Sequence, residues 1–132
     1  MIEFKVSRSL AKTLRNRGLR TTVDRAFEQV MQRCADPALR PEGTWISPPM
    51  RTAYLRLHEL DYAHSFETWD GDQLVGGLYG VSIGGAFFGE SMFSIKPSAS
   101  KAALVWLMEH LRGRGFVLHD TPGNWESTLR IS

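Results

Sequence analysis

The chain has 132 residues, of which 42% are hydrophobic, 23% charged and 11% aromatic, and its formal net charge is +2. This composition excludes a disordered or low-complexity chain, and the length allows one compact domain, residues 1–132, but not two. The single cysteine, Cys34, can form neither an internal disulfide nor a zinc site, which favours a reducing compartment. Because the N-terminus has no apolar run of signal-peptide length, we expect a cytoplasmic protein.

The first third of the chain is predicted to hold a short strand and two helices. Residues 2–6 alternate apolar and charged side chains in the manner of a strand. Ser7 can cap a basic helix that ends near Arg17, before Gly18. Thr22 is a candidate cap for a second helix, whose apolar side chains recur at helical spacing: Val23, Phe27, Val30, Met31 and Cys34.

The middle third is predicted to hold a helix and a meander of strands. The helix begins at Pro48 and Pro49, because proline suits a first helical turn. Its expected core face consists of Met50, Ala53, Tyr54, Leu57 and Leu60. The apolar period then changes, and three strands are predicted over 62–69, 73–82 and 86–93. The turns between them are marked by Asp-Gly-Asp at 70–72 and by Gly-Gly at 84–85.

The last third is predicted to hold a helix, a strand and an irregular tail. The helix runs from Ser98 to Gly113 or Gly115, and a short buried strand follows over 116–118. A helix between two strands permits a parallel crossover. The polar tail 121–132 gives no regular pattern. The predicted fold class is α+β, with helices packed on a mostly antiparallel sheet.

Three carboxylates lie in apolar surroundings. Glu90 is flanked by Phe and Met residues, Asp120 closes the last apolar strand, and Glu67 lies between Phe66 and Trp69. Because a buried charge without a partner is costly, such residues are either paired or functional. For Glu67 we expect pairing with an Arg or Lys side chain, or exposure to water. For Glu90 and Asp120 both interpretations stay open.

Other chemical motifs are incomplete. The Arg-Gly-Arg-Gly segment at 112–115 is weakly similar to the pyrophosphate loop of acetyl-CoA-dependent acetyltransferases, but it follows a helix instead of lying between a strand and a helix start. Ser91 is no nucleophile elbow, because Phe93 replaces the closing glycine. The His, Glu and Asp residues within 58–61 lack metal-ligand spacing, so no metal is expected.

Basic residues concentrate near the N-terminus. The stretch 5–25 holds seven of them and a single acid, Asp24. Such a stretch either binds a polyanion or forms the solvated face of a helix. Arg8, Lys12 and Arg15 would share one face of the predicted helix, at positions i, i+4 and i+7.

Several longer segments form a pattern together. They are Gly-Thr-Trp-Ile at 43–46, Ala-Tyr at 53–54 with Leu-His at 57–58, Ala-His-Ser at 63–65 followed by Glu67 and Trp69, Leu-Val-Gly-Gly-Leu-Tyr-Gly-Val at 74–81, Gly-Glu-Ser-Met-Phe-Ser at 89–94, and Ala-Ser-Lys-Ala-Ala-Leu at 99–104. In this order and spacing they resemble bacterial leucyl/phenylalanyl-tRNA–protein transferases. The similarity extends from about Ser7 to Asp120, and the agreement of several long motifs makes it specific.

The resemblance implies an enzyme that moves Leu or Phe from aminoacyl-tRNA to the N-terminal Arg or Lys of a protein. The product would enter the bacterial N-end degradation pathway. The resemblance also implies a GNAT-like acyltransferase fold that needs no metal or acyl-CoA and no other cofactor. The implied partners are aminoacyl-tRNA and the N-terminus of an acceptor protein, with no membrane.

The same resemblance implies the site residues. Asp120 matches a catalytic-site aspartate, and Glu90 lies in the pocket, where a carboxylate can orient the attacking ammonium group and help it lose a proton. Trp45 matches a tryptophan that helps to hold the terminal adenosine. Arg8, Lys12 and Arg15 match a basic cluster of the family that contacts the acceptor arm of the tRNA. The pocket for the amino-acid side chain would be lined by Leu78, Phe87, Gly89, Glu90, Met92 and Leu107.

The chain departs from the family pattern after Asp120. The family continues with Cys-Gln, whereas this chain has Thr121 and Pro122, and proline has no side-chain amide. We also find no match to the family's N-terminal domain with its Trp-Trp-Ser-Pro motif, or to its C-terminal segment. Two alternatives therefore stay open. One is a non-catalytic module that binds aminoacyl-tRNA or an N-terminal residue, and the other is a GNAT-type enzyme with another donor, which the missing pyrophosphate loop disfavours.

The pocket requires an irregular strand. Phe87 and Met92 would lie on opposite faces of a regular strand, because side chains alternate. Since the resemblance places both in one pocket, we predict a bulge or splay at Phe88-Gly89. Asp120 is expected at the carboxyl end of its strand, facing the cavity with Glu90.

Overall fold

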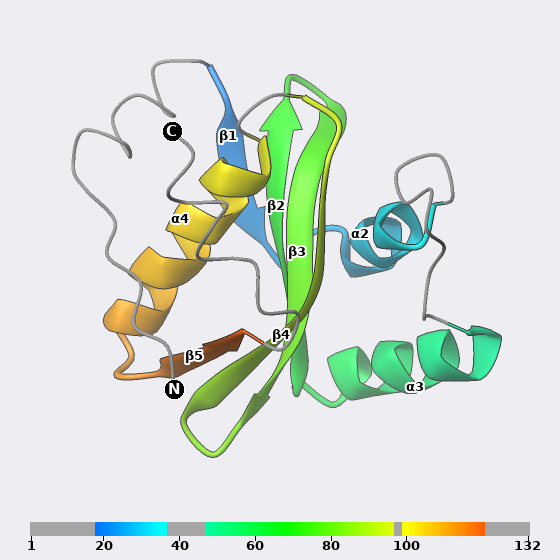
Figure 1. Ribbon diagram of the computed structural model, residues 1–132, viewed down its shortest axis with the longest axis vertical. Coiled ribbons are helices and arrows are strands. Elements are labelled where there is room, and N and C mark those ends of the chain that lie inside the picture. Colours follow the sequence, from blue (N-terminus) through cyan, green and yellow to red (C-terminus); the bar gives the residue numbers. More distant parts are fainter. Residues whose placement is uncertain (1–17, 37–46, 97–98, 121–132) are drawn as a thin grey trace.

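A computed structural model describes residues 18–36, 47–96 and 99–120 of the chain. The strand predicted over 2–6, the basic helix from Ser7 to Arg17 and the tail 121–132 lie outside the described residues. The described part forms one sheet with helices on both of its faces (Figure 1).

The five strands of the sheet lie side by side in chain order. They are β1 (Arg20–Val23), β2 (Ala63–Asp70), β3 (Gln73–Ile83), β4 (Ala86–Ser94) and β5 (Val117–Asp120). Strands β1 to β4 are antiparallel neighbours, and β5 runs parallel to β4. A parallel pair needs a crossover, which α4 (Ala99–Arg112) supplies. The predicted meander, the parallel crossover and the mostly antiparallel sheet are confirmed.

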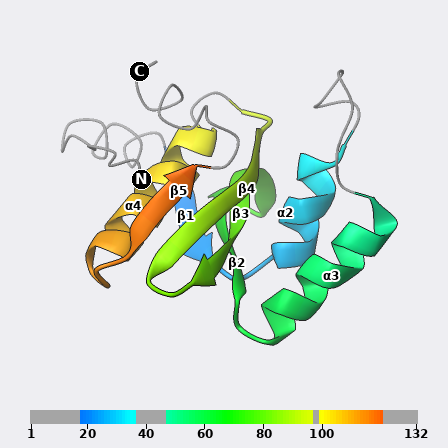
Figure 2. The ribbon, with the colours of Figure 1, turned by 60° about the horizontal axis from the view of Figure 1, so that its bottom comes forward.

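The helices divide between the two faces of the sheet. Helix α4 covers one face, and α2 (Phe27–Cys34) and α3 (Pro48–Glu59) cover the other (Figures 1 and 2). Each face has its own apolar cluster. The α4 cluster includes Phe66, Leu78, Phe87, Leu104, Leu107 and Leu118. The α2–α3 cluster includes Phe27, Val30, Met31, Tyr79, Val81 and Phe93.

Strand β1 corrects the prediction of a helix capped by Thr22. Residues 20–23 pair with β2, where Thr22 lies opposite Glu67. Its hydroxyl donates to the Glu67 carboxylate at 2.6 Å, so this polar side chain serves strand pairing instead of a helix cap. The chain then turns at Asp24, which has a positive φ of 57°, and α2 begins at Phe27. The predicted apolar face of α2 is otherwise confirmed, because its buried residues are Phe27, Val30, Met31 and Cys34.

Helix α3 begins as predicted but is less buried than expected. Pro48 is its first residue, and the Ser47 hydroxyl accepts a hydrogen bond from the Met50 backbone N–H at 3.4 Å. None of its residues is fully buried, and Leu60, predicted on its core face, is 49% exposed. The helix contacts the α2–α3 cluster along one side only, through Tyr54, Leu55 and Leu57.

A glycine brings α4 onto the sheet. A Cβ atom at Gly76 of β3 would lie 2.6 Å from the Cβ of Ala99, the first residue of α4. Only glycine therefore allows this close contact. At the same place the Thr68 hydroxyl of β2 donates to the Ala99 carbonyl at 2.8 Å. These two contacts fix the start of α4 over the centre of the sheet.

None of the helices in the described ranges has both the length and the apolar composition that crossing a bilayer would require.

Candidate active site

Strand β4 contains a bulge at Glu90. Tyr79 of β3 lies opposite Ser91, but the next residue, Gly80, lies opposite Gly89, so Glu90 is an extra residue without a ladder partner. The bulge is thus present in the predicted stretch, one residue after the predicted Phe88-Gly89. A Cβ atom at Gly80 would lie 2.3 Å from the Phe88 carbonyl oxygen, so glycine is needed where the two strands close up beside the bulge.

The bulge turns Phe87 and Met92 to the same face of the sheet. Both side chains pack in or against the α4 cluster, although an odd and an even position would separate them on a regular strand. Met92 lies opposite Leu78 on β3, and Leu107 reaches the same cluster from α4. Four predicted pocket residues therefore meet in one place. Leu78 and Leu107 are fully buried and Phe87 nearly so, whereas Met92 is half-buried.

The Glu90 carboxylate points to the opposite face. It accepts a hydrogen bond from the hydroxyl of Tyr54, which belongs to α3 and packs against the α2–α3 cluster. Burial raises the pKa of Glu90, and the hydrogen bond from Tyr54 opposes that rise only in part. Burial and the neighbouring Glu90 charge raise the pKa of Tyr54 to about 12. The sequence predicts Tyr54 only as a residue on the core-facing side of its helix, and no sequence motif links it to Glu90.

Strand β5 ends beside the bulge. Its last residue, Asp120, lies opposite Gly89, directly before Glu90. The backbone position of Asp120 thus agrees with the expected carboxyl end of the strand, and its side chain is not among those described. Within the described part of the chain no strand pairs with β4 beyond Gly89 on this side.

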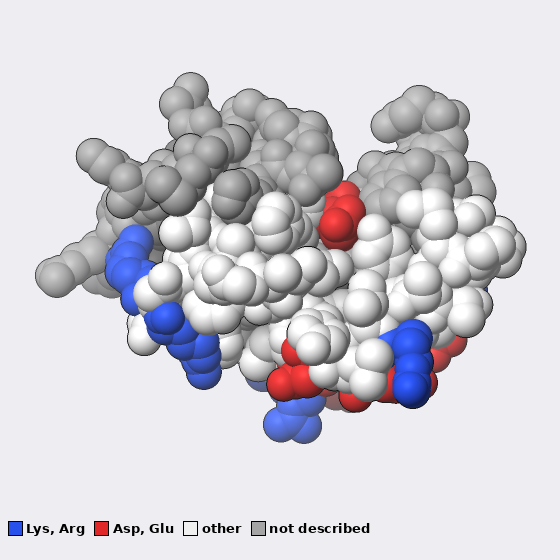
Figure 3. Space-filling view, turned by 90° about the horizontal axis from the view of Figure 1, so that it is seen from below, with Lys and Arg blue, Asp and Glu red and all other residues white. Residues whose placement is uncertain are grey.

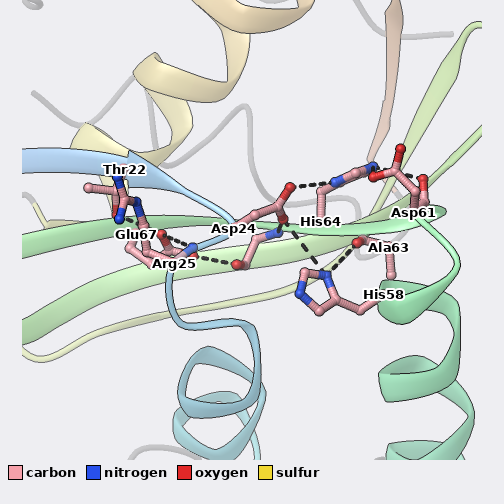
Figure 4. Close-up of polar contacts among 9 residues, drawn as sticks. Thr22, Asp24, Arg25, His58, Asp61, Ala63, His64 and Glu67 are labelled. Carbon is pink, nitrogen blue, oxygen red and sulfur yellow. Dashed lines mark hydrogen bonds and ion pairs between the residues drawn. The ribbon is translucent and has the colours of Figure 1, made fainter.

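Glu67 corrects a second prediction. Its side chain is completely buried instead of facing water, and among the described residues no Arg or Lys side chain pairs with it. The carboxylate accepts hydrogen bonds from the hydroxyls of Thr22 and Ser65 and from the backbone N–H of Arg25 at 3.2 Å (Figure 4). Burial raises the pKa of Glu67, and these donors oppose the rise. The residue therefore fastens β1 and the start of α2 to β2.

A second polar network lies at the turn between β1 and α2 (Figure 4). Nδ1 of His64 lies 2.7 Å from the Asp24 carboxylate, and Nε2 lies 3.1 Å from the Asp61 carbonyl. The Ser65 backbone N–H donates to the same Asp24 carboxylate at 3.0 Å. His58 approaches Asp24 to 3.9 Å and donates from Nδ1 to the Ala63 carbonyl at 2.9 Å.

A hollow among the described residues lies elsewhere. It has a volume of about 460 Å³ and opens between α2 and α3, next to Phe27 and His58, whose rings stack with centroids 4.3 Å apart. None of the predicted pocket residues lines it. We place the candidate site at the bulge instead, because four of the predicted pocket residues, Leu78, Phe87, Met92 and Leu107, lie together beside it.

Some predicted site residues lie outside the described residues. These are Trp45, the Thr121 and Pro122 pair, and the basic cluster of Arg8, Lys12 and Arg15. Among the described residues no group of His, Cys, Asp and Glu side chains is arranged to hold a metal ion.

The fold is that of GNAT-type acyltransferases. An aminoglycoside acetyltransferase from an uncultured soil metagenomic sample, solved in complex with sisomicin, superposes with a TM-score of 0.60 at 12% identity, over 85% of this chain and 84% of that one. An acetyl transferase from Salmonella typhimurium that modifies the N-terminal serine of ribosomal protein L7/L12 superposes with a TM-score of 0.53 at 15% identity, over 86% of this chain and 78% of that one. These likenesses show the fold alone.

Sequence similarity defines the family within that fold. The family described as leucyl/phenylalanyl-tRNA protein transferase matches residues 1–129, so the chain belongs to this family. A leucyl/phenylalanyl-tRNA–protein transferase of Chromobacterium violaceum is 57% identical over 118 residues, which are 89% of this chain and 51% of that protein. Another, from an Anaeromyxobacter species, is 61% identical over 108 residues, 80% of this chain and 46% of that protein. The chain spans about half the length of these curated relatives.

Proposed function

We propose that the protein is an aminoacyltransferase that moves Leu or Phe from aminoacyl-tRNA to the N-terminal Arg or Lys of an acceptor protein, in the cytoplasm. The proposed products are substrates of the N-end degradation pathway. Membership of the family supports this reaction, and the bulge at Glu90 is the observation that carries the assignment of the site. The bulge puts Phe87 and Met92 on one face of the sheet, beside the end of β5, and this supports the assignment of both to the pocket.

The reaction is the aminolysis of an ester. The neutral N-terminal amine attacks the carbonyl carbon of the aminoacyl ester, an amide bond forms, and the C–O bond to the terminal ribose of tRNA breaks. The amine loses a proton, and the ribose oxygen gains one. A site for this reaction must orient the amine, accept its proton and stabilise the charge that develops on the carbonyl oxygen.

Glu90 and Asp120 are the proposed carboxylates for this chemistry. Burial keeps the pKa of Glu90 above its usual value, which moves the carboxylate toward the range of a useful proton acceptor. The hydrogen bond from Tyr54 holds its charged form in place. Asp120 is the last residue of β5 and its backbone lies opposite Gly89, directly before Glu90. One carboxylate can hold the ammonium group while the other takes the proton.

The apolar residues beside the bulge are the proposed pocket for the Leu or Phe side chain. Leu78, Phe87, Met92 and Leu107 lie together on the α4 side, and Met92 is the one with part of its surface accessible. A pocket of this kind recognises an amino acid by burial of its side chain. Because a methylene group contributes only about 1–3 kcal/mol, discrimination between Leu and similar residues would be modest.

The terminal adenosine and the RNA are assigned to residues outside the described ranges. Trp45 is the proposed partner of the adenine base. Arg8, Lys12 and Arg15 are the proposed contacts to the phosphates of the acceptor arm. If all three bind phosphate, their replacement by Ala lowers the slope of log affinity against log salt by roughly 0.9 per contact.

The deciding experiment measures the transfer of labelled Leu and Phe from charged tRNA to a peptide with an N-terminal Arg. We expect transfer by the purified chain and a loss of about 10²- to 10⁴-fold in the Asp120→Asn variant, the usual range for a general acid or base. Asp72→Asn, in the exposed hairpin between β2 and β3, is the matched control and should keep full activity.

Binding measured in parallel separates the alternatives. A chain that transfers neither amino acid yet binds an aminoacyl-adenosine analogue would be a non-catalytic binding module. A chain that binds no analogue would show that the pocket residues are wrongly assigned.

A further inference from the structure

The turn between α4 and β5 carries two exposed arginines, Arg112 and Arg114. The backbone of this turn is well fixed. The Arg114 and Phe116 N–H groups both donate to the Leu111 carbonyl, at 3.1 and 3.0 Å, and Gly115 takes a positive φ of 70°. The Val117 N–H then donates to the Gly85 carbonyl in the hairpin between β3 and β4 at 3.0 Å. The turn therefore presents both arginines from a rigid support.

These arginines differ from the two arginines of α3. Arg51 and Arg56 of α3 each form an ion pair, with Glu28 and Glu59. Within the described ranges neither arginine of the turn has a carboxylate partner, and the Arg114 guanidinium donates to the His110 carbonyl at 3.3 Å instead. Basic side chains gather at the left edge of the face in Figure 3, where α4 ends, and the adjoining surface is largely uncharged.

The local electrostatics agree with an excess of positive charge. His110 belongs to α4 and lies four residues before Arg114. Burial lowers the pKa of His110, and the positive charge of Arg114 lowers it further. The acidic residue nearest to the turn in sequence is the exposed Glu109. Its single negative charge is outnumbered by the two positive charges of Arg112 and Arg114. The hairpin residues Gly84 and Gly85 beside the turn carry no charge. An anion approaching this end of the sheet therefore meets two arginines that no carboxylate of the described residues pairs with.

The position of the turn relates it to the candidate site. Strand β5 leads directly from the turn to Asp120, and its four residues span about 13 Å at 3.3 Å per residue. Stacked nucleotides of one strand rise about 3.4 Å each. A tRNA whose 3′ end lies at the bulge therefore places backbone phosphates three to four nucleotides away at the distance of the turn.

We propose that Arg112 and Arg114 bind the phosphodiester backbone of tRNA near its 3′ end. The inference rests on the proposed function, because it takes the aminoacyl ester to lie at the bulge. Two guanidinium groups on a fixed turn suit two phosphates, since arginine binds phosphate through paired N–H donors. The contact recognises the backbone, so it adds affinity for any tRNA without reading sequence.

A local role for Arg112 must be kept separate. A cation in the last turn of a helix stabilises it through the helix dipole, and Arg112 is the last residue of α4. The Arg112→Gln, Arg114→Gln double variant retains side-chain length and hydrogen-bonding capacity while it removes both charges. A thermal melt of the variant establishes that the fold persists before binding is measured.

The test titrates the full chain with uncharged tRNA at several salt concentrations. We expect the double variant to lower the slope of log affinity against log salt by about 1.4 to 1.8, since each contact contributes about 0.7 to 0.9. The same slopes predict binding roughly 25- to 60-fold weaker at 0.1 M salt. The matched control is the Arg51→Gln, Arg56→Gln double variant, which loses the same charge at paired positions and should keep the wild-type slope.

A second ligand distinguishes this inference from the proposed function. An aminoacyl-adenosine analogue has no neighbouring phosphates, so the double variant should bind it as the wild type does. An unchanged salt slope together with normal analogue binding would overturn the role of the turn and leave the proposed function standing. A reduced slope without analogue binding by the wild type would support the RNA contact and reject the proposed site.

Discussion

Glu67 and Glu90 are both carboxylates in apolar surroundings, and their partners set them apart. Glu67 accepts hydrogen bonds from two hydroxyls and a backbone N–H, and no part of it is exposed. Glu90 is half-buried at the bulge and accepts from the Tyr54 hydroxyl. A fully satisfied buried carboxylate stabilises the fold, whereas an incompletely shielded one can still exchange a proton with a ligand. The two residues should therefore respond differently to the same substitution.

Glu67→Gln should destabilise the protein, and Glu90→Gln should not. At position 67 the side-chain amide has an NH₂ group where the carboxylate has an oxygen, and this group faces the hydroxyl and N–H donors. One buried hydrogen bond is then lost, which lowers the unfolding free energy by about 1–3 kcal/mol. At position 90 the amide oxygen still accepts from Tyr54, so the unfolding free energy should change by less than about 0.5 kcal/mol. Urea denaturation of the two variants measures the difference. Equal destabilisation by both would contradict the division into a structural and a functional carboxylate.

His64 has acceptors at both of its ring nitrogens. Asp24 faces Nδ1 and the Asp61 carbonyl faces Nε2, so only the doubly protonated imidazolium donates to both. The hydrogen bond to Asp24 raises the pKa of His64, and burial opposes this in part. Burial raises the pKa of Asp24, but the hydrogen bonds from His64 and the Ser65 N–H lower it by more, so it ends below its usual value.

The ion pair of His64 and Asp24 should make stability depend on pH in two directions. The raised pKa of His64 contributes stability that is complete below the unfolded value of 6.5 and is lost as pH rises through the folded pKa. The lowered pKa of Asp24 contributes stability that is complete above 3.8 and is lost as pH falls through the folded pKa. Between about pH 4 and 6.5 both contributions are present.

His64→Gln should therefore reduce the melting temperature most near pH 5.5 and least above pH 8. The pair is partly exposed, so we expect a loss of about 1 kcal/mol at pH 5.5, discounted for solvent screening. Melting curves from pH 5 to 9 provide the measurement. Gln73→Ala, at the exposed start of β3, is the control and should leave the melting temperature unchanged at every pH. A loss that is the same at every pH would show that His64 acts by packing alone.

At the scale of elements, long periodic segments were predictable and short polar ones were not. The three meander strands, α3, α4 and the crossover to β5 follow from apolar period and turn residues. Strand β1 was not predicted, because its four residues are a strand only through pairing with β2, which lies more than 40 positions away in the sequence. The same reason hid the partners of Glu67, since Thr22 and Arg25 come next to it only in the folded sheet.

The bulge was predictable because two constraints conflicted. Phe87 and Met92 had to share one face, and a regular strand separates them, so an extra residue had to lie between them. Which residue is extra depends on the partner strand. Gly80 closes up against Phe87 and Phe88, and this contact puts the extra position at Glu90.

Gly80→Ala should disrupt the strand pairing at the bulge. Its Cβ would lie 2.3 Å from a backbone oxygen and 2.6 Å from the Phe87 ring, and neither atom belongs to a flexible chain end. We expect a loss of about 1–3 kcal/mol in stability, as for other overpacked positions. Gly113→Ala is the matched control, because its nearest atoms lie at 3.7 Å and its φ is not positive. Denaturant unfolding should place the control at or slightly above the wild type.

At the scale of the whole molecule, the sheet separates the proposed apolar pocket from the hydrogen bond between Tyr54 and Glu90. The α4 face supplies the apolar cluster that includes Phe87 and Leu107, and the other face supplies Tyr54 for Glu90. The bulge is where a single strand delivers residues to both faces. Family resemblance could name these residues, but their division between two faces is a property of the folded sheet that sequence motifs do not contain.

The replacement at Pro122 decides how much of the proposed activity this chain retains. Members of the family have a glutamine at the matching position, and proline supplies neither a side-chain amide nor a backbone N–H. Loss of one preorganised donor at a developing oxyanion costs on the order of 2.7–4 kcal/mol, which corresponds to roughly 10²- to 10³-fold in rate. If the proposed site is right, orientation of the amine and burial of the amino-acid side chain remain, and we expect them to sustain slow transfer.

Pro122→Gln should therefore raise the rate of Leu or Phe transfer by about 10²- to 10³-fold, with little change in binding of an aminoacyl-adenosine analogue. Single-turnover transfer from charged tRNA measures the rate without interference from product release. Thr121→Cys, which restores the other family residue of the motif, is the control and should change the rate by less than a few-fold, because a thiol is a weak donor. Equal rates in the wild type and Pro122→Gln would mean that the donor comes from elsewhere.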